Sequence, residues 1–161
     1  MTGFSKLLAY MLAAGGPHEQ LARVRWPLHV ALREMSERAG RRGELRILDF
    51  LIAFRASPDV GVLAIGADAA LDELVQAGVL RPQGQMRGAV LVVDENAVIA
   101  LRRELMMLPA ERVRLLQRAG ERWAALASTA AKNRSTATRS SVSTVTSSTP
   151  KRAKCSLAGI A

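Results

Sequence analysis

The stretch that decides the fold is LDELVQAGVLRP, which runs from Leu71 to Pro82. Leu71 and Leu74 recur at the spacing of one helix face and predict a helix over Asp68–Ala77. Gly78 follows directly, and glycine is the residue that most often ends a helix. The chain therefore leaves a helix here and enters a different kind of element.

Two apolar runs after this helix predict an antiparallel hairpin. Val79–Arg81 and Ala89–Val93 are rich in β-branched residues, which favour strands. The segment between them, Pro82–Gly88, contains the proline and glycines of a turn. We therefore expect a helix followed by a small hairpin.

Upstream, the segment Glu44–Ala56 has the apolar periodicity of a helix, and Ser57-Pro58 stops it. The apolar residues of Asp59–Gly66 fit either a short strand or a buried single turn, so the sequence predicts both structures equally for this segment. These two elements would precede the helix of the deciding stretch.

Gly15-Gly16-Pro17 interrupts the pattern near the start of the chain. Met1–Gly16 weakly resembles a signal peptide, with Lys6 before an apolar stretch. That stretch has only eight residues, so we expect the first helix of the domain instead. A short helical stretch over His18–Trp26 and a helix beginning at Pro27 are expected next.

Two further helices are expected after the hairpin. Asp94 or Asn96 can cap the first, over about 95–108, and the second covers about 109–128. The second carries an apolar seam at three- and four-residue steps, namely Leu116, Ala119, Trp123 and Leu126. On another face it carries three arginines at four-residue spacing, namely Arg114, Arg118 and Arg122.

Composition favours a mainly helical body. Of the 161 residues 49% are hydrophobic and only 4% are aromatic, so Ala, Leu and Val must build the core. Ala and Leu are strong helix formers and poor strand formers. We expect one mainly α domain with a small antiparallel β-hairpin, and no membrane span, because no apolar run is long enough.

The segment Thr129–Ala161 differs from the rest of the chain. The net charge is +9, and this segment has no acid and six cations, namely Lys132, Arg134, Arg139, Lys151, Arg152 and Lys154. Its Ser- and Thr-rich composition cannot bury enough apolar area to offset the entropy of ordering. We therefore divide the chain into a helical body, 1–128, with C-terminal helices over 95–128, and a disordered basic tail, 129–161.

Across residues 44–93, the order of helix, short element, helix and hairpin resembles a winged helix-turn-helix domain. In that family leucines pack the third helix on the first, a glycine ends the third helix, and the hairpin forms the wing. The residues at those positions are Leu71, Leu74, Gly78 and Ala89–Val93. The resemblance implies a winged-helix-like body that binds DNA or docks a protein.

The third helix of this resemblance departs from a groove-reading helix. It carries Asp68, Asp72 and Glu73 and no Lys or Arg, and only Gln76 could read a base edge. Acids are repelled by phosphates, and groove-reading helices usually bring basic or amide side chains. Sequence discrimination at DNA should therefore be small, whereas protein docking suits an acidic helix.

The sequence shows no pattern of a catalytic or metal site. His18 and His29 have no cysteine near them and match no metal-ligand spacing, so we expect surface or half-buried structural residues. No phosphate-loop, dinucleotide-binding or hydrolase motif occurs. We expect a protein that is not an enzyme and has no cofactor. The single cysteine, Cys155, fits a reducing compartment, so we expect a cytoplasmic protein.

The first expected function is that of a non-enzymatic DNA-associated protein, a small regulator or accessory factor, with largely non-specific phosphate contacts. Its candidate residues are all basic: Arg81, Arg87, Arg114, Arg118, Arg122, Lys151, Arg152 and Lys154. An arginine stripe of this kind is more often a solvated helix face than a phosphate-binding track. Glu111 with Arg114, and Glu121 with Arg118, have the spacing of surface ion pairs.

The alternative function is that of an adaptor subunit of a larger complex. It would bind a partner protein through the acidic helix and the tryptophan seam, and its candidate residues are Asp68, Asp72, Glu73, Leu116 and Trp123. The same seam could join two copies of the chain, so a homodimer is a third possibility.

Overall fold

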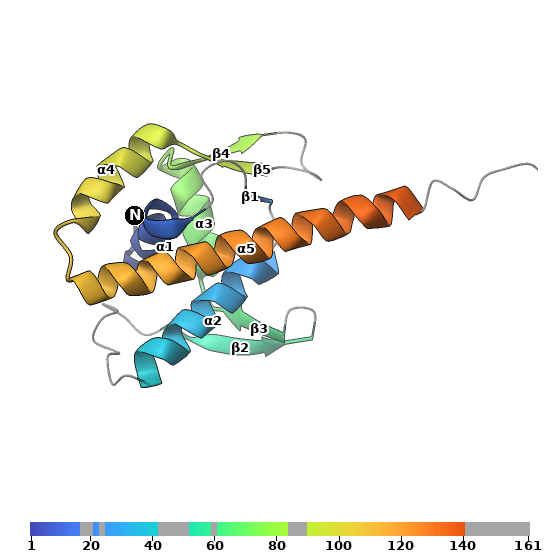
Figure 1. Ribbon diagram of the computed structural model, residues 1–161, viewed down its shortest axis with the longest axis horizontal. Coiled ribbons are helices and arrows are strands. Elements are labelled where there is room, and N and C mark those ends of the chain that lie inside the picture. Colours follow the sequence, from blue (N-terminus) through green and yellow to red (C-terminus); the bar gives the residue numbers. More distant parts are fainter. Residues whose placement is uncertain (17–20, 23–24, 42–51, 59–60, 84–89, 141–161) are drawn as a thin grey trace, which may run out of the picture.

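The structure, a computed structural model, describes residues 1–16, 21–22, 25–41, 52–58, 61–83 and 90–140. Side chains are described at 1–16, 26–40, 52–58, 61–83 and 90–130. The elements in chain order are α1 (Gly3–Gly15), β1 (Leu21–Ala22), α2 (Arg25–Arg41), β2 (Phe54–Ser57), β3 (Gly61–Ala64), α3 (Ala67–Gln76), β4 (Leu80–Gln83), β5 (Val90–Val93), α4 (Glu95–Leu105) and α5 (Ala110–Ser140) (Figure 1).

The long helix α5 crosses the molecule (Figure 1). It packs on both α1 and α2, and α1 also packs on α3 and α4. Figure 1 shows α1, α3 and α4 on one side of α5, and α2 with the β2–β3 hairpin on the other. The expected mainly α fold with small antiparallel strands is confirmed.

The first helix is the centre of the core. Successive residues of α1 from Leu7 to Ala13 are all buried, because α3, α4 and α5 all pack against it. Most other buried side chains are Ala, Leu and Val, as the composition predicts. The expectation that Met1–Gly16 forms the first helix of the domain is therefore confirmed.

The deciding stretch forms the expected helix and strand, but β4 also includes Pro82 and Gln83, which were predicted to lie in the turn. α3 ends at Gln76, and Gly78 has a left-handed φ of 73°, which lets Val79 N–H reach back to the Leu74 carbonyl at 3.0 Å. The hairpin β4–β5 follows, with Leu80 opposite Val93. α3 packs on α1, so the helix beneath it is the first helix of the chain.

A third strand joins this hairpin. β1 pairs with β5 and places Leu21 opposite Leu91, which gives the strand order β1-β5-β4. The short helix predicted over His18–Trp26 is therefore wrong at Leu21–Ala22. Pairing with β5 makes these two residues a strand, and local propensity cannot predict a partner so far along the chain.

The helix predicted over Glu44–Ala56 is wrong at its end. Residues 54–56 belong to β2, which pairs antiparallel with β3 and places Phe54 opposite Ala64. The earlier part, 44–51, lies outside the described residues. For Asp59–Gly66 the sequence allowed either a short strand or a buried turn, and residues 61–64 form a strand.

His29 ties this second hairpin to α2. Its imidazole is only 1% exposed, and Nδ1 accepts a hydrogen bond from the Ala64 N–H at 3.0 Å. The expectation of a surface or half-buried histidine is wrong, because the packing of β3 on α2 encloses the ring. The other histidine, His18, lies outside the described residues.

The C-terminal helices begin as the sequence predicts. Asp94, not Asn96, is the N-cap of α4, because its side chain accepts a hydrogen bond from Ala97 N–H at 3.0 Å. α5 then continues past Ser128, where the tail was expected to begin, to Ser140, and Ala130 is buried. The remainder, 141–161, lies outside the described residues.

Candidate nucleic-acid interface

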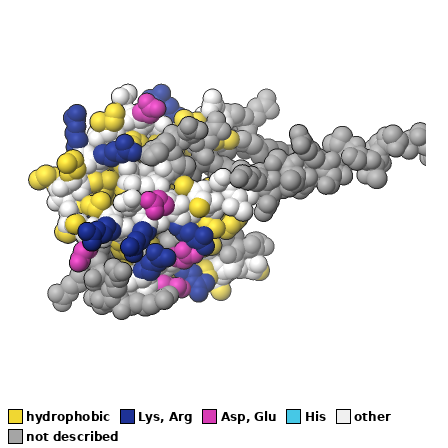
Figure 2. Space-filling view, viewed as in Figure 1, with side chains coloured by type: hydrophobic (Ala, Val, Ile, Leu, Met, Phe, Trp, Pro, Cys, Tyr) yellow, Lys and Arg dark blue, Asp and Glu magenta, His cyan; other side chains and the backbone are white. Residues whose placement is uncertain are grey.

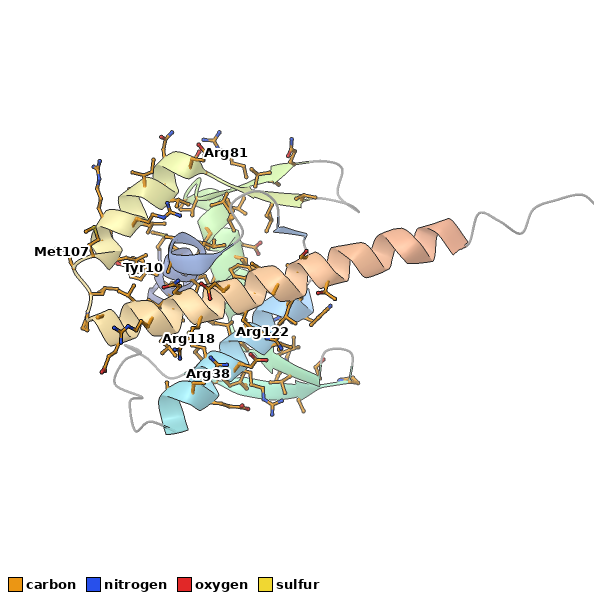
Figure 3. All side chains as sticks on the ribbon, viewed as in Figure 1. Tyr10, Arg38, Arg81, Met107, Arg118 and Arg122 are labelled. Atoms are coloured by element: carbon orange, nitrogen blue, oxygen red, sulfur yellow. The ribbon has the colours of Figure 1, made fainter. Side chains whose placement is uncertain are left out.

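A shallow hollow lies where α2 packs on α5. Its lining has an apolar floor and a charged rim and consists of Ala31, Glu34, Met35, Arg38, Leu115, Arg118, Ala119 and Arg122. Figure 3 shows Arg38 of α2 and the two arginines of α5 on the same side of the helix pair. Two segments far apart in the sequence therefore place three guanidinium groups at one site.

One of these arginines is neutralised across the helix pair. Arg122 donates from Nε to Glu34 Oε2 and from Nη2 to Glu34 Oε1, both at 3.0 Å. Both side chains are partly exposed, and ion pairs of this kind contribute little to the free energy of unfolding. An external anion would have to compete with Glu34 for Arg122, so we exclude Arg122 from the candidate anion-binding arginines.

The other arginines of this face keep their charge uncompensated. Arg38, Arg114 and Arg118 are exposed, and none has an ion pair or hydrogen bond with any side chain that the structure describes. The pairs expected between Glu111 and Arg114 and between Glu121 and Arg118 are not formed. We call these three arginines the arginine face.

Two acids close in sequence to the arginine face, Glu37 and Glu121, have other partners. Glu37 accepts from Arg33 Nε at 2.8 Å, and Glu121 accepts from Gln117 Nε2 at 3.0 Å. Figure 2 shows Lys and Arg side chains on this side of the molecule, with acidic side chains among them. Guanidinium groups bind phosphate oxygens in a bidentate manner, so this surface is chemically suited to a phosphate chain.

The other predicted basic residues are placed differently. Arg81 forms an ion pair through Nη2 with Asp94, the cap of α4, although its side chain is largely exposed. The remaining four, Arg87, Lys151, Arg152 and Lys154, lie outside the described residues.

The acidic helix has one structural carboxylate and two exposed ones. Glu73 accepts hydrogen bonds from Thr2 N–H at 2.7 Å and from Ser5 Oγ at 2.8 Å, at the start of α1. The backbone hydrogen bond from Thr2 lowers the pKa of Glu73. Asp68 and Asp72 are exposed on α3. Glu73, which the adaptor hypothesis assigns to partner binding, therefore helps to hold α3 against α1.

The tryptophan seam is part of this chain's own core. Leu116 is 0% exposed and Trp123 is 3% exposed. The seam continues through the buried Ala127, whereas Leu126 is only half-buried. Neither Leu116 nor Trp123 offers surface to a partner protein or to a second copy in this fold.

Two features of the surface were missed from the sequence. One is Arg38, because only the packing of α2 on α5 brings it beside Arg118. The other joins α1 to α4: Glu104 accepts from Tyr10 OH at 2.8 Å and pairs with Lys6 Nζ at 3.2 Å. The Tyr10 hydrogen bond, with Lys6 second, lowers the pKa of Glu104. No local signal predicts contacts between residues so far apart in sequence.

Within the described ranges, no helix is both long and apolar enough to cross a membrane. Those same ranges hold no cluster of three or more His, Cys, Asp or Glu side chains that could bind a metal ion. No protein-family model, no curated protein and no solved structure matches this chain.

Proposed function

We propose that this protein is a non-enzymatic, DNA-associated regulator or accessory factor that contacts phosphates through the arginine face. The observation that supports this function is that Arg38 of α2 lines the same hollow as Arg118 of α5, with Arg114 one turn before Arg118 on the same face of α5. Among the described side chains these three have no acidic partner. An exposed, uncompensated cationic surface on a rigid helix pair favours binding to a polyanion.

Binding of this kind would depend little on base sequence. Contacts to phosphates position a protein on the duplex but carry no sequence information. In the winged-helix interpretation, α3 and the β4–β5 hairpin are the third helix and the wing, and α1 replaces 44–56 as the helix beneath α3. Asp68 and Asp72 are exposed on α3, so we assign the phosphate contacts to α2 and α5 instead. With this function we expect a cytoplasmic protein.

The test is the salt dependence of duplex binding. Each phosphate neutralised contributes a slope of about −0.9 in log affinity against log salt, so replacing Arg38, Arg114 and Arg118 together by Gln should flatten the slope by up to about 2.7. The corresponding Lys variant should keep most of the slope, because it keeps the charges. Fluorescence anisotropy with a labelled duplex of arbitrary sequence gives both values.

Arg103→Gln is the matched control, because Arg103 is an exposed arginine on α4, away from the hollow, and no partner contacts it among the described residues. We expect its slope to equal that of the unaltered protein. A full slope in the triple Gln variant would contradict the proposal. Deletion of 141–161, which removes Lys151, Arg152 and Lys154, would then show whether the binding residues lie there.

Absence of duplex and single-strand binding even at low salt would also end the DNA proposal. The adaptor function would then be the preferred proposal, and Asp72→Lys would test whether the exposed acids of α3 form a protein-docking surface.

A further inference from the structure

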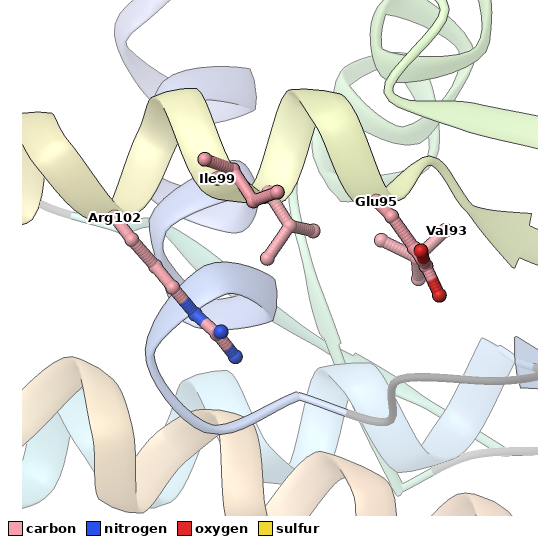
Figure 4. A pocket seen from close by; sticks show the side chains of 5 residues that line it. Val93, Glu95, Ile99 and Arg102 are labelled. Atoms are coloured by element: carbon pink, nitrogen blue, oxygen red, sulfur yellow. The ribbon is translucent and has the colours of Figure 1, made fainter.

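A second hollow lies along α4, on a different part of the surface from the arginine face. It has a volume of about 420 Å³ and is lined by Val93, Glu95, Val98, Ile99 and Arg102. Figure 4 shows Glu95 and Arg102 extending from α4 on the same side, with Ile99 between them along the helix. The hollow therefore has an apolar wall, an acid near one end and a base near the other.

The outer surface of α4 also has large apolar side chains in solvent. Ile99 is 50% exposed, and Met106, which is seven residues further on and thus on the same helix face, is 86% exposed. These two side chains leave apolar area in solvent that a second protein surface could cover. The face consists of Glu95, Ile99, Arg102 and Met106, and we call it the α4 face.

The charges of the α4 face are arranged to match an inverted copy of themselves. Glu95 and Arg102 are seven residues apart, or about 10 Å along a helix axis. If a second α4 lies antiparallel across a two-fold axis near Ile99, each Glu95 stands opposite the Arg102 of the other copy. Ile99 of each copy then lies beside the apolar wall of the other.

We propose that the α4 face is a homodimer interface in which a second copy of this chain is the occupant. An isologous contact uses one patch twice and must be self-complementary, and the order acid, apolar, base along α4 has this property under a two-fold rotation. Glu95 has no partner among the described side chains, and the second copy provides one. Arg102 donates its Nε–H to the Ala13 carbonyl at 3.1 Å, which holds its guanidinium at the end of the hollow.

This interface differs from a dimer through the tryptophan seam. Leu116 and Trp123 are buried within one chain, whereas Ile99 and Met106 of the α4 face are exposed. The proposal does not depend on DNA binding, because its test contains no nucleic acid. The two proposals can therefore fail separately.

The test is sedimentation velocity of the full chain over a concentration series. The unaltered protein should show a monomer–dimer equilibrium. Ile99→Glu should raise the dimer dissociation constant at least about tenfold, because it places two like charges at the centre of an apolar contact. Ile65→Glu is the matched control, since Ile65 has a similar exposure, 55%, and lies before α3. It should leave the dissociation constant unchanged.

A charge exchange tests the orientation of the two copies. Glu95→Arg alone and Arg102→Glu alone should each be monomeric, whereas an equimolar mixture should dimerise, because every acid then meets a base. A protein that stays monomeric throughout the series overturns the proposal, as does a dimer that both Ile99→Glu and Glu95→Arg leave intact. If Arg102→Glu fails to fold because its hydrogen bond to Ala13 is lost, the comparison of Ile99→Glu with Ile65→Glu tests the interface by itself.

Discussion

Gly120→Ala should lower the free energy of unfolding by about 2–3 kcal/mol, although alanine is the better helix former. Gly120 lies where α5 crosses α1 in backbone contact. A Cβ at this position would lie 2.2 Å from the Met11 carbonyl oxygen and 3.0 Å from the Gly15 carbonyl carbon. Both atoms belong to the backbone, so the two helices would have to separate and open the core around α1.

Gly40→Ala is the matched control, because a Cβ at this exposed site in α2 would meet no atom within 4 Å. There the substitution should raise stability by up to about 1 kcal/mol through helix propensity alone. Urea unfolding followed by circular dichroism measures both changes. Equal effects of the two substitutions would contradict the close contact between α1 and α5.

Trp123→Ala should lower the free energy of unfolding by about 3–5 kcal/mol, the largest effect that we expect from a single core truncation. The side chain is 3% exposed and belongs to the continuous core that includes α1 and α2. Alanine would leave a cavity that the adjoining helices could close only in part. The loss should appear as a lower urea midpoint.

Leu126→Ala is the comparison, because Leu126 is only half-buried one turn further along the same helix, so its truncation should cost clearly less. The Trp123 effect should also be independent of protein concentration, since the residue packs within one chain. An unfolding midpoint that is unchanged by Trp123→Ala would show that the residue lies outside the core.

The elements predicted correctly from the sequence are those whose signals are local. The periodicity of α3 and the left-handed Gly78 lie within a few residues of one another, and they fix the end of the helix and the start of β4. Asp94 caps α4 through the N–H of a residue three positions on. Each of these signals is complete without knowledge of any distant segment.

The missed elements depend on partners far along the chain. β1 is a strand because Leu21 meets Leu91, and the end of the predicted 44–56 helix is a strand because Phe54 meets Ala64. In both places pairing with a second strand outweighs the helical periodicity of the apolar residues. A search for helix spacing alone cannot detect such pairing.

The candidate site was predicted in part for the same reason. Arg114 and Arg118 follow from the four-residue repeat on α5, which is a local pattern. Arg38 becomes their neighbour only through the packing of α2 on α5, and Arg122 leaves the set only because Glu34 of α2 reaches it. Charge patterning identified the helix that carries the site, and tertiary packing selected its residues.

The most direct test of the DNA proposal is an amide chemical-shift titration of the labelled protein with a short duplex at low salt. We predict that the shifts concentrate on α2 around 34–38 and on α5 around 114–122, and that they weaken together as salt is added. Shifts concentrated on α3 and the β4–β5 hairpin would contradict phosphate contact through the arginine face. The complete absence of shifts at low salt would contradict DNA binding altogether.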